Sequence, residues 1–165
     1  MSTLRMALTI VAASFAAAGC AGYYSGSTLK PGVSTGADVE ATMGKPAERI
    51  ALRSGDSLWE YPRGPEGRQT YSVRVGGDGV VRRVSQVLTI ENLAKLRVGQ
   101  STPASVERIL GPPVQVSENA REHREVWEYD MYADTRAVIV YVQFDPKGLL
   151  REVLQVDART SVDGD

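Results

Sequence analysis

The apolar and polar positions in the body of the chain follow one plan twice. In its first occurrence, Val39 and Met43 stand at helical spacing, which predicts a short helix with one buried face. Further on, Tyr71, Val73 and Val75 alternate with polar residues, which predicts a half-buried strand with one face in water. The pattern therefore predicts a short helical segment followed by strands.

The same plan returns 67 to 69 residues later. Residues 29–46 and 96–113 share nine identities in eighteen positions, and the Trp-Glu-Tyr sequence at 59–61 recurs at 127–129. Alternating Val138, Val140 and Val142 repeat the strand pattern at the same offset. Self-similarity at a fixed offset indicates an internal duplication.

Helix boundaries are marked alike in the two copies. Thr35 and Thr102 precede the helical stretches as N-caps, and Pro103 occupies a first helical position, where its missing N–H costs nothing. Gly44 and Gly111, each followed two positions later by proline, end the helices.

Hairpin turns at 77–79 and 145–148 lead into strands over 80–88 and 149–156. With the strand that carries Trp-Glu-Tyr, each copy becomes a short helical segment packed on a three-stranded antiparallel sheet, an α+β fold. A copy of about 60 residues is marginally stable alone. We therefore expect the two copies to pack together or to share a continuous sheet.

The N-terminal segment predicts export from the cytoplasm. Thirteen uncharged, mostly apolar residues at 6–18 would span about 20 Å as a helix, less than the roughly 30 Å core of a bilayer. Small residues follow directly before Cys20, the single cysteine. This is the pattern of a secretory signal peptide cut between Gly19 and Cys20.

Residues 17–20, Ala-Ala-Gly-Cys, resemble the lipobox of bacterial lipoproteins. The resemblance implies acyl chains such as palmitate on Cys20, and two or more chains anchor a protein stably. Ala21, rather than Asp, implies sorting to the outer membrane, with the protein facing the periplasm. The alternative is a plain secretory signal that leaves a free cysteine.

These patterns divide the chain as follows. We expect a signal peptide at 1–19, the acylated cysteine and a tether at 20–28, a first repeat at 29–88, a second repeat at 89–157 and a loose tail at 158–165.

The composition of the chain argues against two kinds of function, zinc binding and nucleic-acid binding. One His and one Cys cannot build a Cys/His zinc site, and a formal charge of −1 argues against nucleic-acid binding. Residues 24–88 carry nine basic and seven acidic groups, whereas residues 89–165 carry nine and thirteen. The membrane-proximal copy is thus the more basic one, and its loop with Arg63 and Arg68 is our preferred partner contact.

Catalysis finds little support in the motifs. Glu60 and Glu128 could be called an acid/base pair, but duplication explains their equivalent positions in the two copies better. We expect a non-enzyme that needs no cofactor or metal.

The aromatic residues of the two Trp-Glu-Tyr sequences have two interpretations. They form either a recognition surface or the aromatic core of each copy. The residues concerned are Trp59, Tyr61, Trp127 and Tyr129.

The repeated motifs resemble the BamE family of outer-membrane lipoproteins, also called SmpA/OmlA. The residues that carry this resemblance are Leu29, Gly32, Val39, Gly44, Pro46, Trp59 and Tyr61 in the first copy, and Leu96, Gly99, Val106, Gly111, Pro113, Trp127, Tyr129, Phe144, Asp145 and Gly148 in the second. The resemblance implies a non-catalytic accessory or scaffold role in outer-membrane β-barrel assembly or envelope integrity, with components of the assembly machinery as partners.

The tandem arrangement is also similar to the β-lactamase inhibitory proteins. That similarity implies the alternative function, a periplasm-facing inhibitor or ligand-binding module with exposed aromatic residues on a concave sheet.

Overall fold

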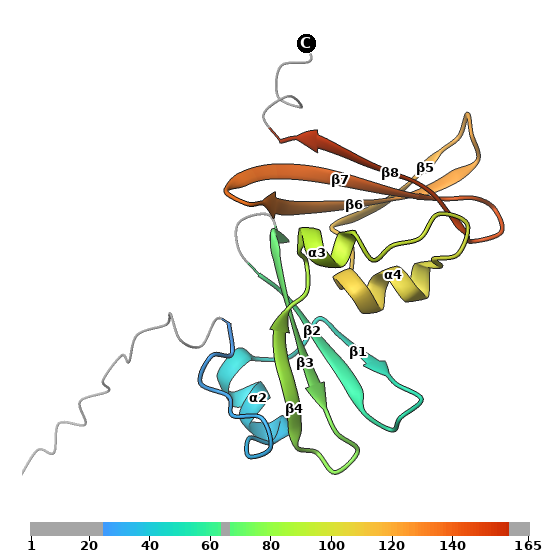
Figure 1. Cartoon of the computed structure of the whole chain (residues 1–165). Helices are drawn as coiled ribbons and strands as arrows, with labels where there is room; N and C mark the ends of the chain where they lie inside the picture. The colour runs from blue at the N-terminus through green and yellow to red at the C-terminus, as the bar shows by residue number, and fades with distance from the viewer. Residues whose placement is uncertain (1–24, 64–66, 159–165) are drawn as a thin grey trace, which may run out of the picture.

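The computed structural model describes residues 25–63 and 67–158 (Figure 1). The expected signal peptide and Cys20, most of the tether, and residues 159–165 of the expected tail lie outside the described residues. The fold is α+β and contains two four-stranded antiparallel sheets. The sheets are separate, so the expected alternative of one continuous sheet is wrong.

The first half combines one helix with a meander of four strands. Each strand pairs with the next along the chain, in the order β1-β2-β3-β4. The elements are α2 (Gly36–Met43), β1 (Glu48–Ala51), β2 (Ser57–Arg63), β3 (Gln69–Val75) and β4 (Val81–Gln86).

The second half follows the same order with longer strands and an additional helical turn. Its sheet has the order β5-β6-β7-β8. The elements are α3 (Ile90–Leu93), α4 (Pro103–Leu110), β5 (Gln115–Asn119), β6 (Arg124–Ala133), β7 (Arg136–Phe144) and β8 (Leu150–Asp157).

The predicted helix boundaries are confirmed. The side chains of Thr35 and Thr102 accept hydrogen bonds from the backbone N–H groups of Asp38 and Ser105 at the third helical position. This satisfies one of the backbone donors that a helix start leaves free. At the other end, Gly44 and Gly111 have φ of 81° and 84°, a backbone conformation that favours glycine.

The expectation of three strands in each sheet is wrong, because it omitted β1 and β5. These strands pair with β2 and β6 along one edge of each sheet. Their side chains are exposed or partly exposed, so they lack the apolar alternation by which a strand is recognised in sequence. Backbone pairing, rather than burial, defines them.

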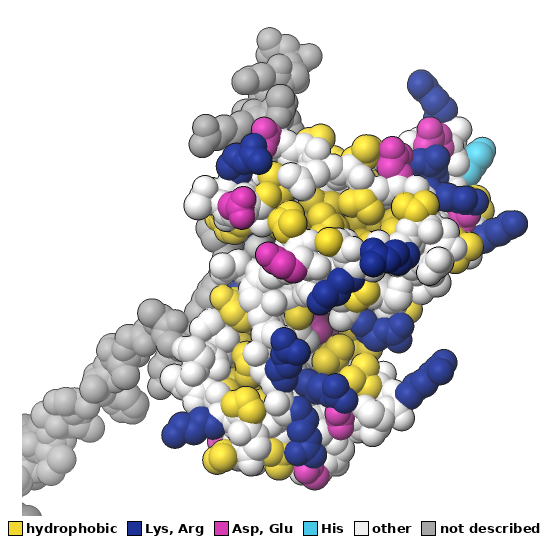
Figure 2. All heavy atoms as spheres, viewed as in Figure 1, with side chains coloured by type: hydrophobic (Ala, Val, Ile, Leu, Met, Phe, Trp, Pro, Cys, Tyr) yellow, Lys and Arg dark blue, Asp and Glu magenta, His cyan; other side chains and the backbone are white. Residues whose placement is uncertain are grey.

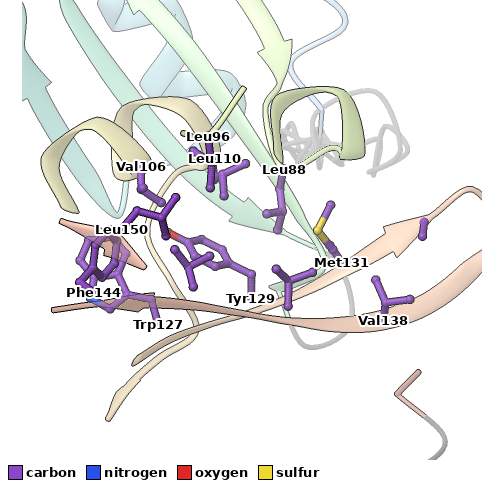
Figure 3. Close-up of a cluster of buried hydrophobic side chains, with 13 residues drawn as sticks. Leu88, Leu96, Val106, Leu110, Trp127, Tyr129, Met131, Val138, Phe144 and Leu150 are labelled. Carbon is purple, nitrogen blue, oxygen red and sulfur yellow. The ribbon is translucent and has the colours of Figure 1, made fainter. Parts of the chain in front are cut away.

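Each half has its own hydrophobic core. In the first half, α2 contributes Val39 and Met43 to a cluster against one face of the sheet. In the second, Val106 and Leu110 of α4 pack on side chains of β6 and β7 (Figure 3). The aromatic rings of Trp127 and Phe144 pack edge to face, with their centroids 5.3 Å apart. This is a favourable arrangement for aromatic rings.

The two halves pack together, with α3 and α4 lying between the sheets (Figure 1). The end of α4 at Gly111 lies against Thr70 and Glu60 on the outer face of the first sheet. Thr70, Ser72 and Glu60 are therefore 1%, 5% and 1% exposed. The predicted wet face of β3 is wrong at Thr70 and Ser72, because the second half covers it.

Candidate functional site

The four aromatic residues singled out in the sequence lie in the two cores. Trp59 and Trp127 are 9% and 8% exposed, and Tyr61 and Tyr129 are fully buried. The core interpretation therefore describes their positions, and their rings are not part of a surface that a partner can reach. The exposed aromatic face that the inhibitor alternative needs is not formed by these residues.

The two buried tyrosines close the ends of the helices. The hydroxyl of Tyr61 donates to the carbonyl of Gly44 at 3.2 Å, and that of Tyr129 donates to Gly111 at 3.1 Å. Burial raises the pKa of Tyr61 to about 12 and raises the pKa of Tyr129 further. Both groups thus stay protonated as donors, which suits a structural role.

Arg63 and Arg68 are engaged with the protein itself. The Arg63 guanidinium donates to the carbonyl of Met43 at 2.6 Å and lies 5.1 Å from the centre of the Tyr61 ring. The Arg68 guanidinium lies 5.9 Å from the centre of the Tyr132 ring in the second half. Residues 64–66, between them, lie outside the described residues, and a partner contact at this loop stays a prediction.

A different surface stands out on the second sheet. Alternate residues of β6, β7 and β8 point away from the core, and we call this side the outer face. Figure 1 shows no described helix or strand over it, and the Arg68 guanidinium of the first half reaches Tyr132 at its edge. Its members, by strand pairing, are Val126, Glu128, Asp130, Tyr132, Ala137, Ile139, Tyr141, Gln143, Glu152, Leu154 and Val156.

Three cross-strand pairs make part of this outer face apolar. Tyr132 pairs with Ala137 across β6 and β7, whereas the other two pairs cross β7 and β8. We call the six residues of these pairs the apolar band: Tyr132, Ala137, Ile139, Tyr141, Leu154 and Val156. Leu154, Val156 and Tyr132 are 42%, 40% and 37% exposed. Contiguous apolar side chains at a surface mark sites of interaction.

Charged groups border the apolar band. Glu128 and Asp130 of β6 stand opposite Tyr141 and Ile139. Burial and the nearby Asp130 carboxylate raise the pKa of Glu128. At the far end of the outer face, Arg124 contacts Glu152 at 3.0 Å and Gln143 at 3.3 Å. The band therefore has polar side chains at one end of the outer face and the two acidic side chains of β6 along one side.

A separate feature of the same half is a hollow at the end with the β5–β6 hairpin. It is an open hollow of about 720 Å³ with Val116, Phe144 and Pro103 among its apolar lining residues. His123 and Arg124 also line it. Among residues 25–63 and 67–158, no group of three His, Cys, Asp or Glu side chains could hold a metal ion.

The apolar band was not predicted from the sequence, although β7 carries a signal for it. In β7, the run Ala137-Val138-Ile139-Val140-Tyr141-Val142 is apolar at successive positions rather than alternate ones. Successive strand residues point to opposite faces, so such a run makes both faces apolar. Only the face toward α4 is covered by the described core.

Comparison with known proteins adds one family. Residues 85–153 match the family model described as the outer membrane protein assembly factor BamE domain. This range begins just before α3 and ends within β8, so it spans the second half and most of its outer face. The resemblance that the motifs indicated is confirmed over this range.

Two solved structures are similar to the chain at low identity. A DUF4309 family protein (YjgB) from Bacillus subtilis is 19% identical, with 78% of this chain and 82% of that chain covered and a TM-score of 0.33. A putative β-lactamase inhibitor protein from Streptococcus mutans is 15% identical, with 75% and 83% covered and a TM-score of 0.34. No curated protein matches the chain.

No helix among the described residues, 25–63 and 67–158, is both long enough and apolar enough to cross a membrane.

Proposed function

We propose that the protein is a lipid-anchored, non-catalytic accessory subunit of the outer-membrane β-barrel assembly machinery. The observation that carries the proposal is the match of residues 85–153 to the BamE domain. Most of the matched range lies in the half of the molecule that exposes the apolar band, and Leu154 and Val156 of the band follow directly after its end. The family match and the apolar band therefore belong to the same half of the chain.

The apolar band is the surface that we assign to the protein partner. Leu154 and Val156 lie on β8, which is the last strand in the order of its sheet, so a partner can reach the band from the side of this strand. Burying apolar area at such a surface contributes about 25 cal/mol per Å² before the costs of association are subtracted. The neighbouring Glu128 and Asp130 favour a partner with basic residues at the rim of the contact.

Membrane attachment is assigned to Cys20. The lipobox-like sequence at 17–20 supports acylation of this residue after cleavage behind Gly19. Residues 20–28 then tether the first repeat, 29–88, close to the inner leaflet of the outer membrane. The second repeat, 89–157, lies further along the chain, where it meets a periplasmic partner.

Co-purification tests this function. Envelopes are solubilised in mild detergent, and the protein is captured through a C-terminal tag. We expect β-barrel assembly components with the wild type and their loss with Leu154→Ser/Val156→Ser. A Val33→Ser variant is the matched control, because Val33 is an exposed valine of the first half at 71%. Failure to recover any assembly component with the wild type would contradict the proposal.

A further inference from the structure

A small cavity that is open to solvent lies where the two halves meet, at residues outside the apolar band. Its volume is about 270 Å³, and it is lined by residues of β4, α3 and α4 together with the segment that joins the halves. Arg83 of β4, Lys95 just after α3 and Arg108 of α4 contribute its charges. Figure 2 shows basic side chains gathered over this middle region of the molecule.

The charge of the cavity is of one sign. Its lining contains three basic side chains and no Asp or Glu. Arg83 and Arg108 form no ion pair with any described residue, whereas the adjacent Arg82 pairs with Asp78 at 2.6 Å. The three residues are exposed, so water and salt screen their mutual repulsion. An anion bound between them would interact favourably with all three.

Asn92, which lines the cavity, holds the side chain of Lys95 in place. Asn92 donates to the carbonyls of Val87 and Ile109 and accepts from the Lys95 ammonium at 2.6 Å. This orients the Lys95 ammonium. Glu91, one helical turn before Lys95, is the carboxylate that interacts with it electrostatically, but Glu91 does not line the cavity.

Gln86 supplies an unused acceptor. Its Nε2 donates to the carbonyl of Leu88 at 2.8 Å, which fixes the orientation of the amide. Its Oε1 is buried and accepts no hydrogen bond from the described part of the chain. A buried acceptor without a partner costs free energy. A ligand that carries a hydroxyl beside its negative charge would satisfy it.

We propose that the cavity between β4, α3 and α4 binds a phosphate group, either as hydrogen phosphate or as a phosphate ester with a hydroxyl. Arg83, Lys95 and Arg108 bind the anionic oxygens, and Gln86 Oε1 accepts from the hydroxyl. Arginine fits this role because its guanidinium donates two parallel hydrogen bonds to phosphate oxygens. The proposal does not depend on the proposed function.

The position of the cavity gives the binding a structural consequence. Arg83 belongs to the first half, whereas Lys95 and Arg108 belong to the second. A phosphate group held by both halves stabilises their packed arrangement relative to any arrangement in which they separate.

Isothermal titration calorimetry with the full chain in neutral detergent tests the proposal. Sodium phosphate is titrated at constant ionic strength against a sodium chloride blank. We expect saturable binding to the wild type and binding weakened about tenfold or more by Arg83→Gln/Arg108→Gln. The control variant Arg53→Gln/Arg121→Gln removes two exposed charges outside the cavity and should bind like the wild type.

A second set of titrations identifies the source of the phosphate. Glycerol 3-phosphate is compared with mixed micelles that contain phosphatidylglycerol or, as a blank, phosphatidylcholine. If the phosphatidylglycerol micelles displace inorganic phosphate, the site binds a lipid headgroup. If only glycerol 3-phosphate displaces it, the site binds a soluble phosphate ester. The proposal is overturned if the wild type shows no saturable phosphate binding, or if the two double variants bind equally well.

Discussion

The carboxylate of Glu60 in the first half lies against Gly111, the residue that ends α4 in the second half. A Cβ added to Gly111 would lie 3.4 Å from Glu60 Oε2 and 2.6 Å from Thr70 Cγ2. The glycine thus serves two purposes: its positive φ ends the helix, and its missing side chain lets the helix end approach the first sheet. The contact between the halves depends on this close approach.

Gly111→Ala should therefore destabilise the protein more than Gly44→Ala. The two glycines have almost the same backbone angles, and each alanine variant has a conformational cost of about 1–3 kcal/mol. Only Gly111 has neighbours within 4 Å of the added Cβ. Chemical denaturation of the two variants measures the difference, and equal losses of stability would contradict the assigned contact between the halves.

Glu60→Gln should flatten the pH dependence of stability. Burial, supported by the carboxylates of Glu48 and Glu107, raises the pKa of Glu60 from 4.5 to about 7, although the Ser72 hydroxyl acts in the opposite direction. The folded state therefore holds this proton where the unfolded chain has released it. The free energy of unfolding falls as the pH rises from 4.5 through 7, by about 3 kcal/mol in total.

Denaturation curves at pH 5 and pH 8 check this prediction. The glutamine mimics the protonated carboxyl, so we expect the variant to match the wild type at pH 5 and to exceed it at pH 8. Glu118→Gln, at an exposed position of β5, makes the same change of charge as a control. The raised pKa of Glu60 would be contradicted if the wild type were more stable at pH 8 than at pH 5 while Glu60→Gln showed no such gain.

Tyr129→Phe should lower stability by about 1–2 kcal/mol, because the Gly111 carbonyl loses its buried donor while the ring stays in place. The hydrogen bond of Tyr61 to Gly44 is only partly buried, so water can replace it. Tyr61→Phe should therefore cost less. Thermal unfolding of the two variants gives the comparison, and a neutral Tyr129→Phe would show that this hydrogen bond does not hold the helix end.

Cys20→Ser should release the protein from the membrane. The prediction rests on the lipobox-like residues at 17–20 and on the stable anchoring that several acyl chains provide. Labelling with palmitate followed by fractionation measures both effects. Incorporation of label into the serine variant, or its retention in the membrane fraction, would contradict acylation at Cys20.

Local chemistry was sufficient to predict α2 and α4 from the sequence. Thr102 caps α4, Pro103 starts it and Gly111 ends it, and each of these residues acts on its immediate neighbours. The edge strand β5 could not be recognised in this way, because its residues Gln115–Asn119 are exposed or partly exposed and only their pairing with β6 makes them a strand. Strand pairing is a contact between separate segments, so a local pattern does not contain it.

The candidate surfaces were harder to predict for the same reason. Thr70 looks like a water-facing strand residue until α4 of the other half covers it. The cavity joins Arg83 of the first half to Arg108 of the second, and neither arginine belongs to the repeated motifs. The apolar run 137–142, in contrast, did carry a usable signal, since it exceeds what one buried face requires.

Site-specific photocrosslinking at Leu154 in intact cells shows directly whether the apolar band contacts the β-barrel assembly machinery. The photoreactive residue replaces Leu154, which is 42% exposed within the apolar band, and a second strain carries it at Val33 of the first half, which is 71% exposed. We expect a crosslink from position 154 to a component of the β-barrel assembly machinery and none from position 33. If the protein is present in the outer membrane but position 154 gives no crosslink to such a component, the proposed role of the apolar band is wrong.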